Sequence, residues 1–280
     1  MPRQTLIIGC GYTGLPLALR LKARGDEVSV WVRSPESAAS LMEHGFARII
    51  TGNVADEVVW NGIRKTYDLV IHCASSSRGD ETVYREVFLS GVEMMNRHVP
   101  EARRIFVSST SVYGQTQGEV VTEESPAEPA SATSRILREA EDAALVAKAI
   151  VVRSSAIYGP ERGVLFQKFF RGEAVIEGDG LRWINQIHRD DLVGALEHLA
   201  EAGELEQIYN ATDDAPVTYR DFYAWCSEFL KKPMPPSGPV NPQRKRGLTN
   251  KRVSNAKLRA TGWSPRYPSF REGLKDVQET

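Results

Sequence analysis

Three glycines near the start of the chain are the residues whose types and spacing point most directly to chemistry. The stretch GCGYTG places Gly9, Gly11 and Gly14 after a short apolar run and before a helical pattern. The first glycine permits a tight turn, the second lets the backbone approach a pyrophosphate, and the third lets strand and helix pack closely. A purely structural turn is the alternative. The flanking strand and helix favour a dinucleotide site that includes Tyr12 and Thr13, with phosphates at the helix N-terminus.

A second chemical feature follows the next apolar run, VSVWV. The ribose 2′-hydroxyl of NAD is usually held by an acidic residue about 20 residues beyond the glycine motif. This chain has Arg33 and Ser34 at that place, and no carboxylate before Glu36. Arg33 matches the charge of a 2′-phosphate, and Ser34 can add a hydrogen bond. A surface arginine is the alternative, but the pattern predicts NADP as the cofactor in preference to NAD.

Hydroxyl side chains gather in the stretch FVSSTSVYG (106–114). They could cap a strand end, but Ser109 falls at the carboxyl edge of the expected sheet, where ligands of such folds bind. Tyr113, Tyr158 and His188 are further groups that could handle substrate or a proton, since histidine as a residue type is suited to proton transfer near neutral pH. Each has a plainer interpretation as a packing or hydrogen-bonded residue. His188 in particular stands beside two aspartates, as a structural histidine would.

Composition narrows the classes of partner. The 35 basic and 36 acidic residues give a net charge of -1, which excludes a strong field for nucleic acid or membrane surfaces. No run approaches the ~18 apolar residues of a membrane span. The three cysteines fit reduced thiols in a cytoplasmic protein, and no His/Cys/carboxylate group has metal-ligand spacing. We therefore expect a small-molecule substrate and no metal, and we interpret one basic run as a solvated loop: Arg244, Lys245, Arg246, Lys251 and Arg252.

The elements that must position these residues alternate along the first half of the chain. Such alternation predicts a parallel sheet with crossover helices. Mostly apolar runs, typical of strands buried on both faces, occur at 5–9, 28–32, 47–50, 68–74, 104–109 and 149–155. Helical patterns lie between them at 13–24, 81–97 and 132–147. In the second helix, the buried face is marked by residues at helical spacing: Tyr84, Phe88, Val92 and Met95.

The pattern loosens after Pro160. Residues 182–188 and 207–211 are expected to form strands, 191–202 and 219–230 helices, and 231–242 a proline-rich loop. The fold class is thus α/β, a Rossmann-type doubly wound parallel sheet with a smaller C-terminal substrate lobe. We assign the dinucleotide-binding domain to residues 1–159 plus about 182–212. The substrate lobe takes about 160–181 and 213–280.

Several further stretches carry a family resemblance, namely DLVIHCA (68–74), VVRSSAIYGP (151–160), IHRDDLVGAL (187–196), IYNATDD (208–214) and KLRATGWSPRYPSFREGL (257–274). With the glycine motif and FVSSTSVYG, they make the chain resemble the extended short-chain dehydrogenase/reductases, the group of nucleotide-sugar epimerases and dehydratases. The match covers nearly the whole length. The resemblance implies that Ser109 holds the substrate oxygen and that Tyr113 orients substrate. It also implies that cofactor contacts include Asn53, Val54, Ala74 and Ser75.

The family's proton-transfer pair is missing. Its members carry a tyrosine, whose lysine partner four residues later lowers the phenol pKa and holds the nicotinamide ribose. Aligning Pro129 and Glu141 with the family's proline and glutamate puts Thr133 at the tyrosine and Leu137 at the lysine. A threonine hydroxyl lacks the phenol's pKa near 10, and leucine carries no charge. The chain therefore resembles atypical members, which keep the scaffold and vary the active site.

Two more positions depart from the family. Phe88 stands where the helix often has an asparagine, and Ile184 where an arginine holds the substrate's pyrophosphate. Arg182 lies two residues earlier, on the same face of a strand, and it or Arg189 is a candidate substitute. Tyr158, Arg182 and His188 are accordingly our candidate substrate residues. The family's habit of dimerising through the helices at 81–97 and 132–147 makes a homodimer an expectation.

Two functional hypotheses stay open at this point. The first is an NADP-dependent oxidoreductase or epimerase/dehydratase-like enzyme acting on a carbonyl or sugar-type molecule. Its catalytic residues would be Ser109, Tyr113 and Thr133, which is feasible because general acid help is worth ~10²–10⁴-fold and not the whole rate. The second is a non-catalytic NADP-binding sensor or regulatory protein. A scaffold without cofactor fits the intact glycine motif poorly.

Overall fold

The computed structural model describes residues 1–63, 66–77, 79–240 and 249–278. The strands are β1 Gln4–Ile8, β2 Glu27–Val32, β3 Arg48–Thr51, β4 Leu69–His72, β5 Arg103–Ser109, β6 Glu119–Val121, β7 Ile150–Ser154, β8 Ala156–Tyr158, β9 Ile176–Glu177, β10 Trp183–Ile184, β11 Gln186–His188, β12 Ile208–Ala211, β13 Val217–Thr218, β14 Ser237–Gly238 and β15 Lys251–Val253. The helices are α1 Gly14–Ala23, α2 Pro35–Ala39, α3 Glu57–Asn61, α4 Glu81–Tyr84, α5 Gly91–His98, α6 Ala132–Val146, α7 Val164–Phe170, α8 Arg189–Ala202, α9 Tyr219–Leu230, α10 Ala256–Ala260 and α11 Phe270–Gln278. The remaining helical segments among the described residues are η1 Met42–His44, the π-helical η2 Arg85–Ser90 and η3 Thr110–Val112.

Seven strands form the main sheet in the order β12-β7-β5-β4-β1-β2-β3. β1 pairs in parallel with both β2 and β4, so that Thr5 lies opposite Val28 on one side and Leu69 on the other. The pairings of β2 with β3 and of β4 with β5 are also parallel. This order reverses direction beside β1, as in a doubly wound Rossmann sheet. The predicted fold class is confirmed.

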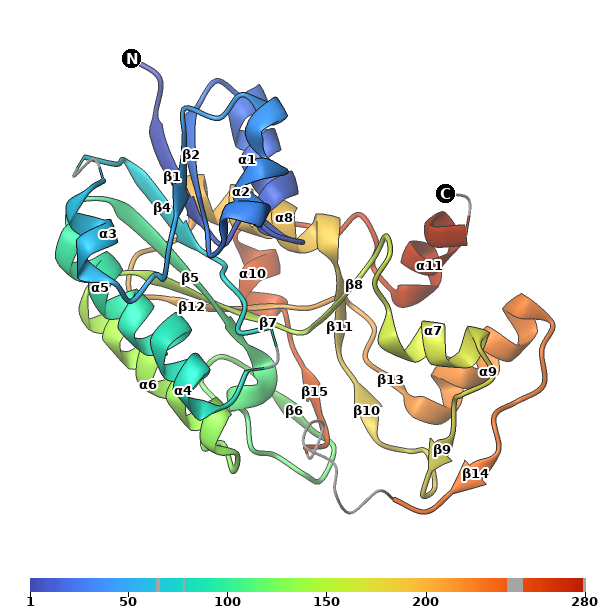
Figure 1. Ribbon diagram of the computed structural model, residues 1–280. Helices are drawn as coiled ribbons and strands as arrows, with labels where there is room; N and C mark the ends of the chain where they lie inside the picture. Colours follow the sequence, from blue (N-terminus) through green and yellow to red (C-terminus); the bar gives the residue numbers. More distant parts are fainter. Residues whose placement is uncertain (64–65, 78, 241–248, 279–280) are drawn as a thin grey trace. The chain divides into compact units, whose positions relative to one another are not determined.

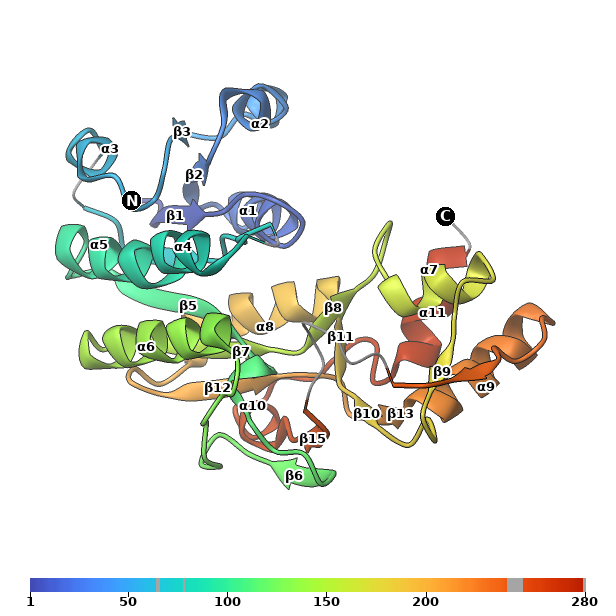
Figure 2. The ribbon, with the colours of Figure 1, turned by 60° about the horizontal axis from the view of Figure 1, so that its bottom comes forward.

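Helices cover both faces of this sheet (Figures 1 and 2). On one face α3, α5 and α6 lie side by side, and Asn96 on α5 donates a hydrogen bond to the Ala143 carbonyl on α6 at 2.9 Å. On the other face α1 lies next to α8, where Arg20 pairs with Glu197 at 3.2 Å. Strands covered on both faces need apolar side chains throughout, which explains the burial of every residue of β4.

Two predicted elements are interrupted. The helix expected at 81–97 contains the π-helical segment η2, where Val87 turns its carbonyl toward Nε2 of His72 at 3.0 Å. The strand expected at 182–188 breaks into β10 and β11 at Asn185. The Asn185 side chain instead makes hydrogen bonds to the backbone of β15. It donates to the Lys251 carbonyl at 2.9 Å and accepts from the Val253 N–H at 2.7 Å.

The chain divides into two compact units. The first comprises Met1–Val112, Ala127–Arg153 and Val193–Tyr209, and the second comprises Tyr113–Pro126, Ser154–Leu192 and Asn210–Thr280. The sequence division placed 113–126, 154–159, 182–192 and 210–212 with the nucleotide-binding part. In the structure these residues group with the second unit, because β6 pairs with β15 and β8 pairs with β11.

Each unit has its own aromatic core. In the first unit Trp31 and Trp60 pack with ring centroids 4.7 Å apart, and each indole N–H donates to a backbone carbonyl, of Gly52 and Val54 respectively. Buried tryptophans need such partners for their polar atom. In the second unit the core gathers residues of α7, α9 and α11: Phe166, Phe169, Phe222, Tyr223, Phe270 and Leu274.

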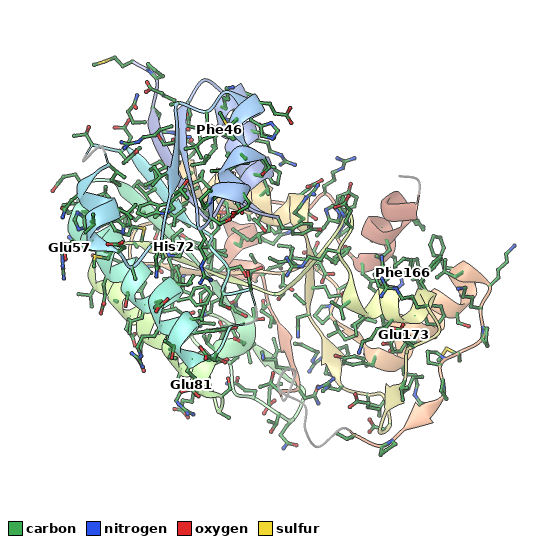
Figure 3. The ribbon with its side chains drawn as sticks, viewed as in Figure 1. Phe46, Glu57, His72, Glu81, Phe166 and Glu173 are labelled. Atoms are coloured by element: carbon green, nitrogen blue, oxygen red, sulfur yellow. The ribbon has the colours of Figure 1, made fainter. Side chains whose placement is uncertain are left out.

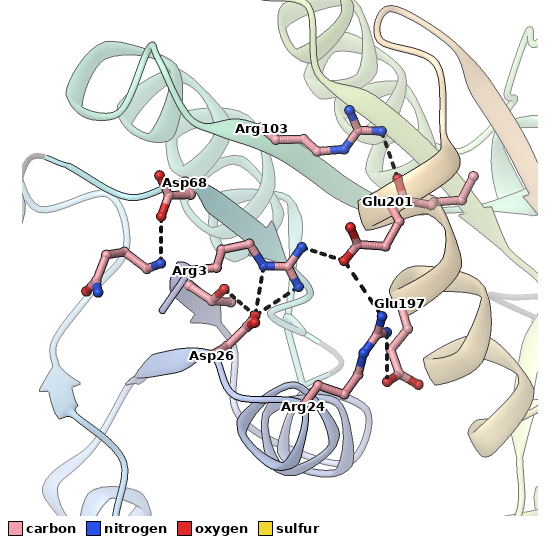
Figure 4. A network of polar contacts seen from close by, with 10 residues as sticks. Arg3, Arg24, Asp26, Asp68, Arg103, Glu197 and Glu201 are labelled. Atoms are coloured by element: carbon pink, nitrogen blue, oxygen red, sulfur yellow. Dashed lines mark hydrogen bonds and ion pairs between the residues drawn. The ribbon is translucent and has the colours of Figure 1, made fainter. Parts of the chain in front are cut away.

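A network of charged side chains joins the edge of the first unit to α8 (Figure 4). Arg3 contacts Asp26 at 2.9 Å and Glu201 at 2.5 Å, and Glu197 lies 3.7 Å from Arg24. Most of these side chains are partly exposed, so each ion pair is worth roughly 1 kcal/mol or less. Their contribution is mainly to orient α8 against β1 and α1.

A buried ion pair lies beneath α6. Arg153 of β7 donates to both carboxylate oxygens of Glu141, at 2.7 Å for the shortest contact, and both residues are 1% exposed or less. Ser108 of β5 donates to the same carboxylate at 2.6 Å, and Arg138 approaches it at 3.3 Å. One carboxylate therefore joins two strands and a helix. Removing its main cation leaves a buried charge largely uncompensated.

This pair gives a stability prediction. Arg153→Met should lower the free energy of unfolding by on the order of 3–5 kcal/mol, because Glu141 keeps its burial but loses its counter-charge. Urea unfolding measures the loss. Arg85→Met is the matched control, since the Arg85–Glu139 pair is half exposed and should cost less than about 1 kcal/mol. The double variant Glu141→Leu/Arg153→Met should recover much of the lost stability. Equal losses in Arg153→Met and Arg85→Met would contradict the assignment.

Candidate active site

The glycine motif forms the turn between β1 and α1. Gly9 has φ +91°, and a Cβ there would lie 2.3 Å from the Ala74 Cα. A Cβ on Gly14 would lie 2.1 Å from the Gly9 carbonyl oxygen. Neither position has room for a side chain, so both glycines are required by the packing of the chain on itself. Gly11 differs, because a Cβ there would meet nothing within 4 Å among the described residues.

The loop therefore leaves open space beside Gly11, between two tightly packed turns. The ten-residue helix α1 begins immediately after it, and Thr13 at its N-cap makes no side-chain capping bond. Uncapped N–H groups at a helix start attract phosphate. The Cys73 thiol supports the turn from β4 by donating to the Gly9 carbonyl at 3.4 Å. These residues fit a dinucleotide pyrophosphate by the space beside Gly11 and by the positive end of the α1 dipole.

Arg33 and Ser34 follow β2. The Arg33 side chain is exposed and makes no hydrogen bond or ion pair within the described part of the chain. Ser34 is the N-cap of α2, and its hydroxyl oxygen accepts the Ser37 N–H at 3.3 Å. Arg33 is thus a guanidinium held at the end of a buried strand with its donors open.

The other residues expected around the cofactor lie at the same edge of the sheet. Asn53 accepts from the Ala55 N–H at 3.0 Å and donates to Glu86 at 3.3 Å, so its amide is partly engaged. Val54 is buried in the core of the first unit. Ser75 accepts from the Ser77 N–H at 3.3 Å. The main sheet thus brings the predicted set together after β1, β3 and β4, although the side chain of Val54 faces the core.

His72, at the end of β4, is wholly buried beside these residues (Figure 3). Burial lowers the pKa of its imidazole to about 4, against the smaller effect of its contact with the Val87 carbonyl. Its ring meets Phe106 edge-on at 5.6 Å. A neutral, enclosed histidine serves packing here and does not carry protons at neutral pH.

A chain of hydroxyl groups includes Thr133, the residue that our sequence alignment puts at the family's tyrosine position. The Ser131 hydroxyl, at the N-cap of α6, donates to Ser134 at 2.9 Å and lies 3.5 Å from Thr133. Ser134 donates in turn to Ser111 at 3.1 Å, and the Ser111 N–H bonds the Ser109 oxygen at 3.1 Å. We call Thr133, Ser131, Ser134 and Ser111 the hydroxyl chain. It connects the start of α6 to the end of β5 within the first unit.

Leu137 lies one turn further along α6 and is only 4% exposed. It packs into the first unit and supplies no charge. Leu137, which our sequence alignment puts at the family's lysine position, is therefore part of the core, whereas Thr133 is half-buried within the hydroxyl chain.

Tyr113 lies in the second unit and is fully buried. Its phenol donates to the Asn210 side-chain oxygen at 2.9 Å. Its backbone carbonyl accepts from Lys251 Nζ at 3.1 Å, and the same ammonium donates to Thr249 at 2.7 Å. Burial lowers the pKa of Lys251 to about 8. Interpreting Lys251 as part of a solvated basic run was wrong, because β15 carries it inside; Arg244, Lys245 and Arg246 lie outside the described residues.

Tyr158 and His188 meet in the second unit. Their rings stand 5.3 Å apart, and His188 also lies against Tyr267 at 4.1 Å. His188 Nδ1 accepts the Asp190 N–H at 3.2 Å, and the Tyr158 hydroxyl donates to the Ser269 carbonyl at 3.3 Å. Burial raises the pKa of the Tyr158 phenol, and nearby carboxylates add to the rise. Both side chains are thus buried and held by the C-terminal segment.

Two buried aspartates near this pair escaped the sequence analysis. Asp191 accepts the N–H groups of Arg266 at 2.6 Å and Tyr267 at 3.0 Å, yet burial raises its pKa to about 6. Burial also raises the pKa of Asp213 well above the ordinary value. Both stand in stretches quoted for the family resemblance, but the sequence pattern does not report their burial. Carboxyl groups in this state hold protons more readily than surface ones.

Arg182 packs against an aromatic ring in the second unit. Its guanidinium lies 4.6 Å from the centre of the Tyr219 ring, a cation–π arrangement. Ile184, at the family's arginine position, is buried in the second unit. No group of three His, Cys, Asp or Glu side chains among the described residues could hold a metal ion. No helix in the described ranges is long and apolar enough to cross a membrane.

Comparison with known proteins agrees with this geometry. Residues 5–212 match the NAD dependent epimerase/dehydratase family. Protein YeeZ of Escherichia coli (strain K12) is 29% identical over 237 residues, covering 81% of this chain and 84% of that protein. Epimerase family protein SDR39U1 of Mus musculus is 25% identical over 289 residues, covering 96% and 97%.

Solved structures share the fold. The dTDP-glucose 4,6-dehydratase of Bacillus anthracis, in complex with NAD, superposes with a TM-score of 0.81 over 99% of this chain and 96% of that chain, at 19% identity. The family match spans the glycine loop, the hydroxyl chain and the whole main sheet. On that evidence the chain belongs to the NAD dependent epimerase/dehydratase family.

Proposed function

We propose that this protein is an NADP-dependent oxidoreductase or epimerase/dehydratase-like enzyme acting on a carbonyl or sugar-type small molecule. The observation that carries the proposal is the glycine loop, whose outer glycines are packed against the chain while Gly11 faces open space. A loop kept only for its own turn would not need open backbone at its centre. Membership of a family named for its use of NAD supports the same conclusion.

Cofactor binding is assigned to the first unit. The backbone at Gly11 and the uncapped start of α1 hold the pyrophosphate. Arg33 holds the 2′-phosphate, with its open guanidinium donors supplying a charge-assisted contact. A bound nicotinamide supplies hydride transfer to or from the substrate carbon. The B. anthracis relative holds NAD, so the preference for NADP rests on Arg33 alone.

Proton handling is assigned to the hydroxyl groups beside α6. Ser109 donates a hydrogen bond to the substrate oxygen from the end of β5. Thr133 supplies or takes up the proton, and Ser131, Ser134 and Ser111 relay it through hydrogen bonds of 2.9–3.5 Å. No hydroxyl group of the hydroxyl chain ionises readily, so this relay transfers protons less effectively than a phenol–lysine pair. Tyr113, whose phenol already donates to Asn210, is assigned to positioning the residues around it.

A second function has its own support. Leu137 is buried where the family's lysine would contact the nicotinamide ribose, and the hydroxyl chain contains no group with a pKa near neutral. A protein that binds NADP without turnover, as a sensor of the cofactor ratio, would have this arrangement. Both functions require NADP binding, so a measurement of cofactor affinity does not distinguish them. A measurement of substrate turnover does.

The cofactor assignment is tested at Arg33. Arg33→Asp should weaken NADPH binding by roughly 10- to 100-fold, since a charge-assisted hydrogen bond is replaced by like-charge repulsion, and should leave NADH binding nearly unchanged. Isothermal titration with both cofactors measures the two affinities. Arg171→Asp, an equal change of charge at an exposed position of the second unit, is the control. Equal affinity of the unaltered protein for NADPH and NADH would refute the NADP assignment.

The glycine loop gives a paired prediction. Gly11→Ala should change thermal stability little but weaken NADPH binding by roughly tenfold, because the new methyl group stands where the pyrophosphate approaches. Gly9→Ala should instead destabilise the protein by on the order of 1–3 kcal/mol, because φ is +91° and Ala74 leaves no room. Differential scanning fluorimetry with and without NADPH separates the two effects. Unchanged affinity in Gly11→Ala would count against cofactor binding at this loop.

The catalytic assignment is tested by turnover. With a substrate found by screening aldehydes, ketones and sugar nucleotides for NADPH oxidation, Ser109→Ala and Thr133→Val should each lower kcat by roughly 10²-fold or more. The Kd for NADPH should stay within about twofold in both variants. Unaltered kcat in Ser109→Ala would remove that residue from the site. Tight NADPH binding without oxidation of any tested substrate would favour the sensor.

A further inference from the structure

The side-chain amide of Gln186 is buried without a hydrogen bond. Gln186 begins β11 in the second unit and is 8% exposed. Its Nε2 has no partner among the described residues. Its backbone carbonyl accepts from the Asp213 N–H at 2.8 Å and from the Thr212 hydroxyl at 3.1 Å. A buried donor without a hydrogen bond costs about 1–3 kcal/mol of folding free energy, so such a group in a native fold calls for an explanation.

The strand pairing shows what lies beside this amide. β11 runs parallel to β8, with Gln186 opposite Ala156 and His188 opposite Tyr158. Paired residues, and residues two apart on a strand, present their side chains on the same face. Gln186 therefore shares a face with Ala156, whose small side chain is exposed. The unused donor stands next to a position that a short side chain leaves open.

The charges around the same face select the kind of ligand. Asp213, Asp191 and Glu272 all act on the Tyr158 phenol and raise its pKa, so carboxylates lie around this end of the second unit. His188 has its Nδ1 occupied as an acceptor by Asp190, which leaves the proton of the neutral ring on Nε2. Glu272 stays ionised, because its contacts with Ser269 outweigh burial and lower its pKa, and an ionised carboxylate repels a phosphate or carboxylate group of a ligand. An uncharged oxygen acceptor meets no such repulsion and satisfies the amide.

We propose that Gln186 is a substrate-binding residue whose amide N–H donates to an uncharged carbonyl or hydroxyl oxygen of a sugar-type molecule beside Ala156. The identification of the ligand as a substrate rests on the proposed function. The binding itself rests on the burial and the open donor of Gln186. The proposal also predicts the specificity of this face. The part of the substrate that binds here is neutral, and an acidic sugar binds more weakly.

The first experiment uses the protein without ligand. Gln186→Met keeps the length and shape of the side chain and removes the unused donor. Its Tm should equal or exceed that of the unaltered chain, because nothing in the free protein bonds the amide. The comparison variant is Asn185→Leu, whose amide makes two hydrogen bonds and whose Tm should fall. A clear fall in Tm for Gln186→Met would mean that water or protein already satisfies the amide, and would overturn the proposal.

The second experiment observes the amide directly. The ¹⁵N side-chain resonances of Gln186 are identified by their loss in Gln186→Met, and the unaltered protein is titrated with D-glucose and with D-glucuronate, each with and without saturating NADPH. D-glucose should shift these resonances at lower concentration than D-glucuronate, which differs by a carboxylate. Equal shifts, a preference for D-glucuronate or no shift with either sugar would overturn the proposal.

The two proposals fail separately. Loss of the cofactor assignment would appear as NADPH affinity that is indifferent to Arg33→Asp, with the response of Gln186 to D-glucose unaffected. Loss of the Gln186 assignment would appear in the Tm and resonance measurements, with NADPH binding unaffected. Gln186→Met should in addition raise KM for a neutral carbonyl substrate more than it lowers kcat, as expected when a binding contact is removed.

Discussion

The carboxylate of Glu141 is the interaction on which the arrangement of the candidate site depends. It accepts hydrogen bonds from β5 through Ser108 and from β7 through Arg153, while belonging itself to α6. Ser109 follows Ser108 directly, and Thr133 opens the helix two turns before Glu141. The register between the strand end and the helix start is therefore set by a buried, charged contact that apolar side chains could not orient. The hydroxyl chain runs between these same two elements, from the start of α6 to the end of β5.

The family's scaffold and its chemistry have separated in this chain. The features that depend on backbone, namely the tight turns at Gly9 and Gly14 and the open start of α1, are complete. The features that depend on side-chain ionisation differ from the family pattern in our sequence alignment, which puts Thr133 and Leu137 at the positions of the phenol and the lysine. What remains beside α6 is a set of neutral hydroxyls, whereas titratable groups with raised pKa values, Asp191 and Asp213, lie in the second unit. Fold membership consequently says more about the cofactor than about the reaction.

Local patterns predicted the main sheet because its strands are apolar along their whole length and its glycine turn has a fixed spacing. Predicting Ser34 as a residue at the end of β2 needed only its position in sequence. The burial of Lys251 could not be predicted the same way, because it follows from the pairing of β15 with β6, more than 100 residues earlier. The break at Asn185 likewise depends on hydrogen bonds to β15. Gln186, lying in a stretch that otherwise looks like one strand, gave no sequence signal that its amide would be left without a partner.

The burial of Lys251 couples folding to the release of a proton. Its pKa is about 8 in the folded chain, below the ordinary 10.5, because the ammonium loses water and gains only neutral oxygen acceptors. Between those two values the unfolded chain holds a proton that the folded chain has released, so stability from this group rises with pH across that window. Near pH 9, folding of the second unit therefore discharges hydrogen ions into the medium. The enthalpy of folding then includes the ionisation heat of whichever buffer accepts them.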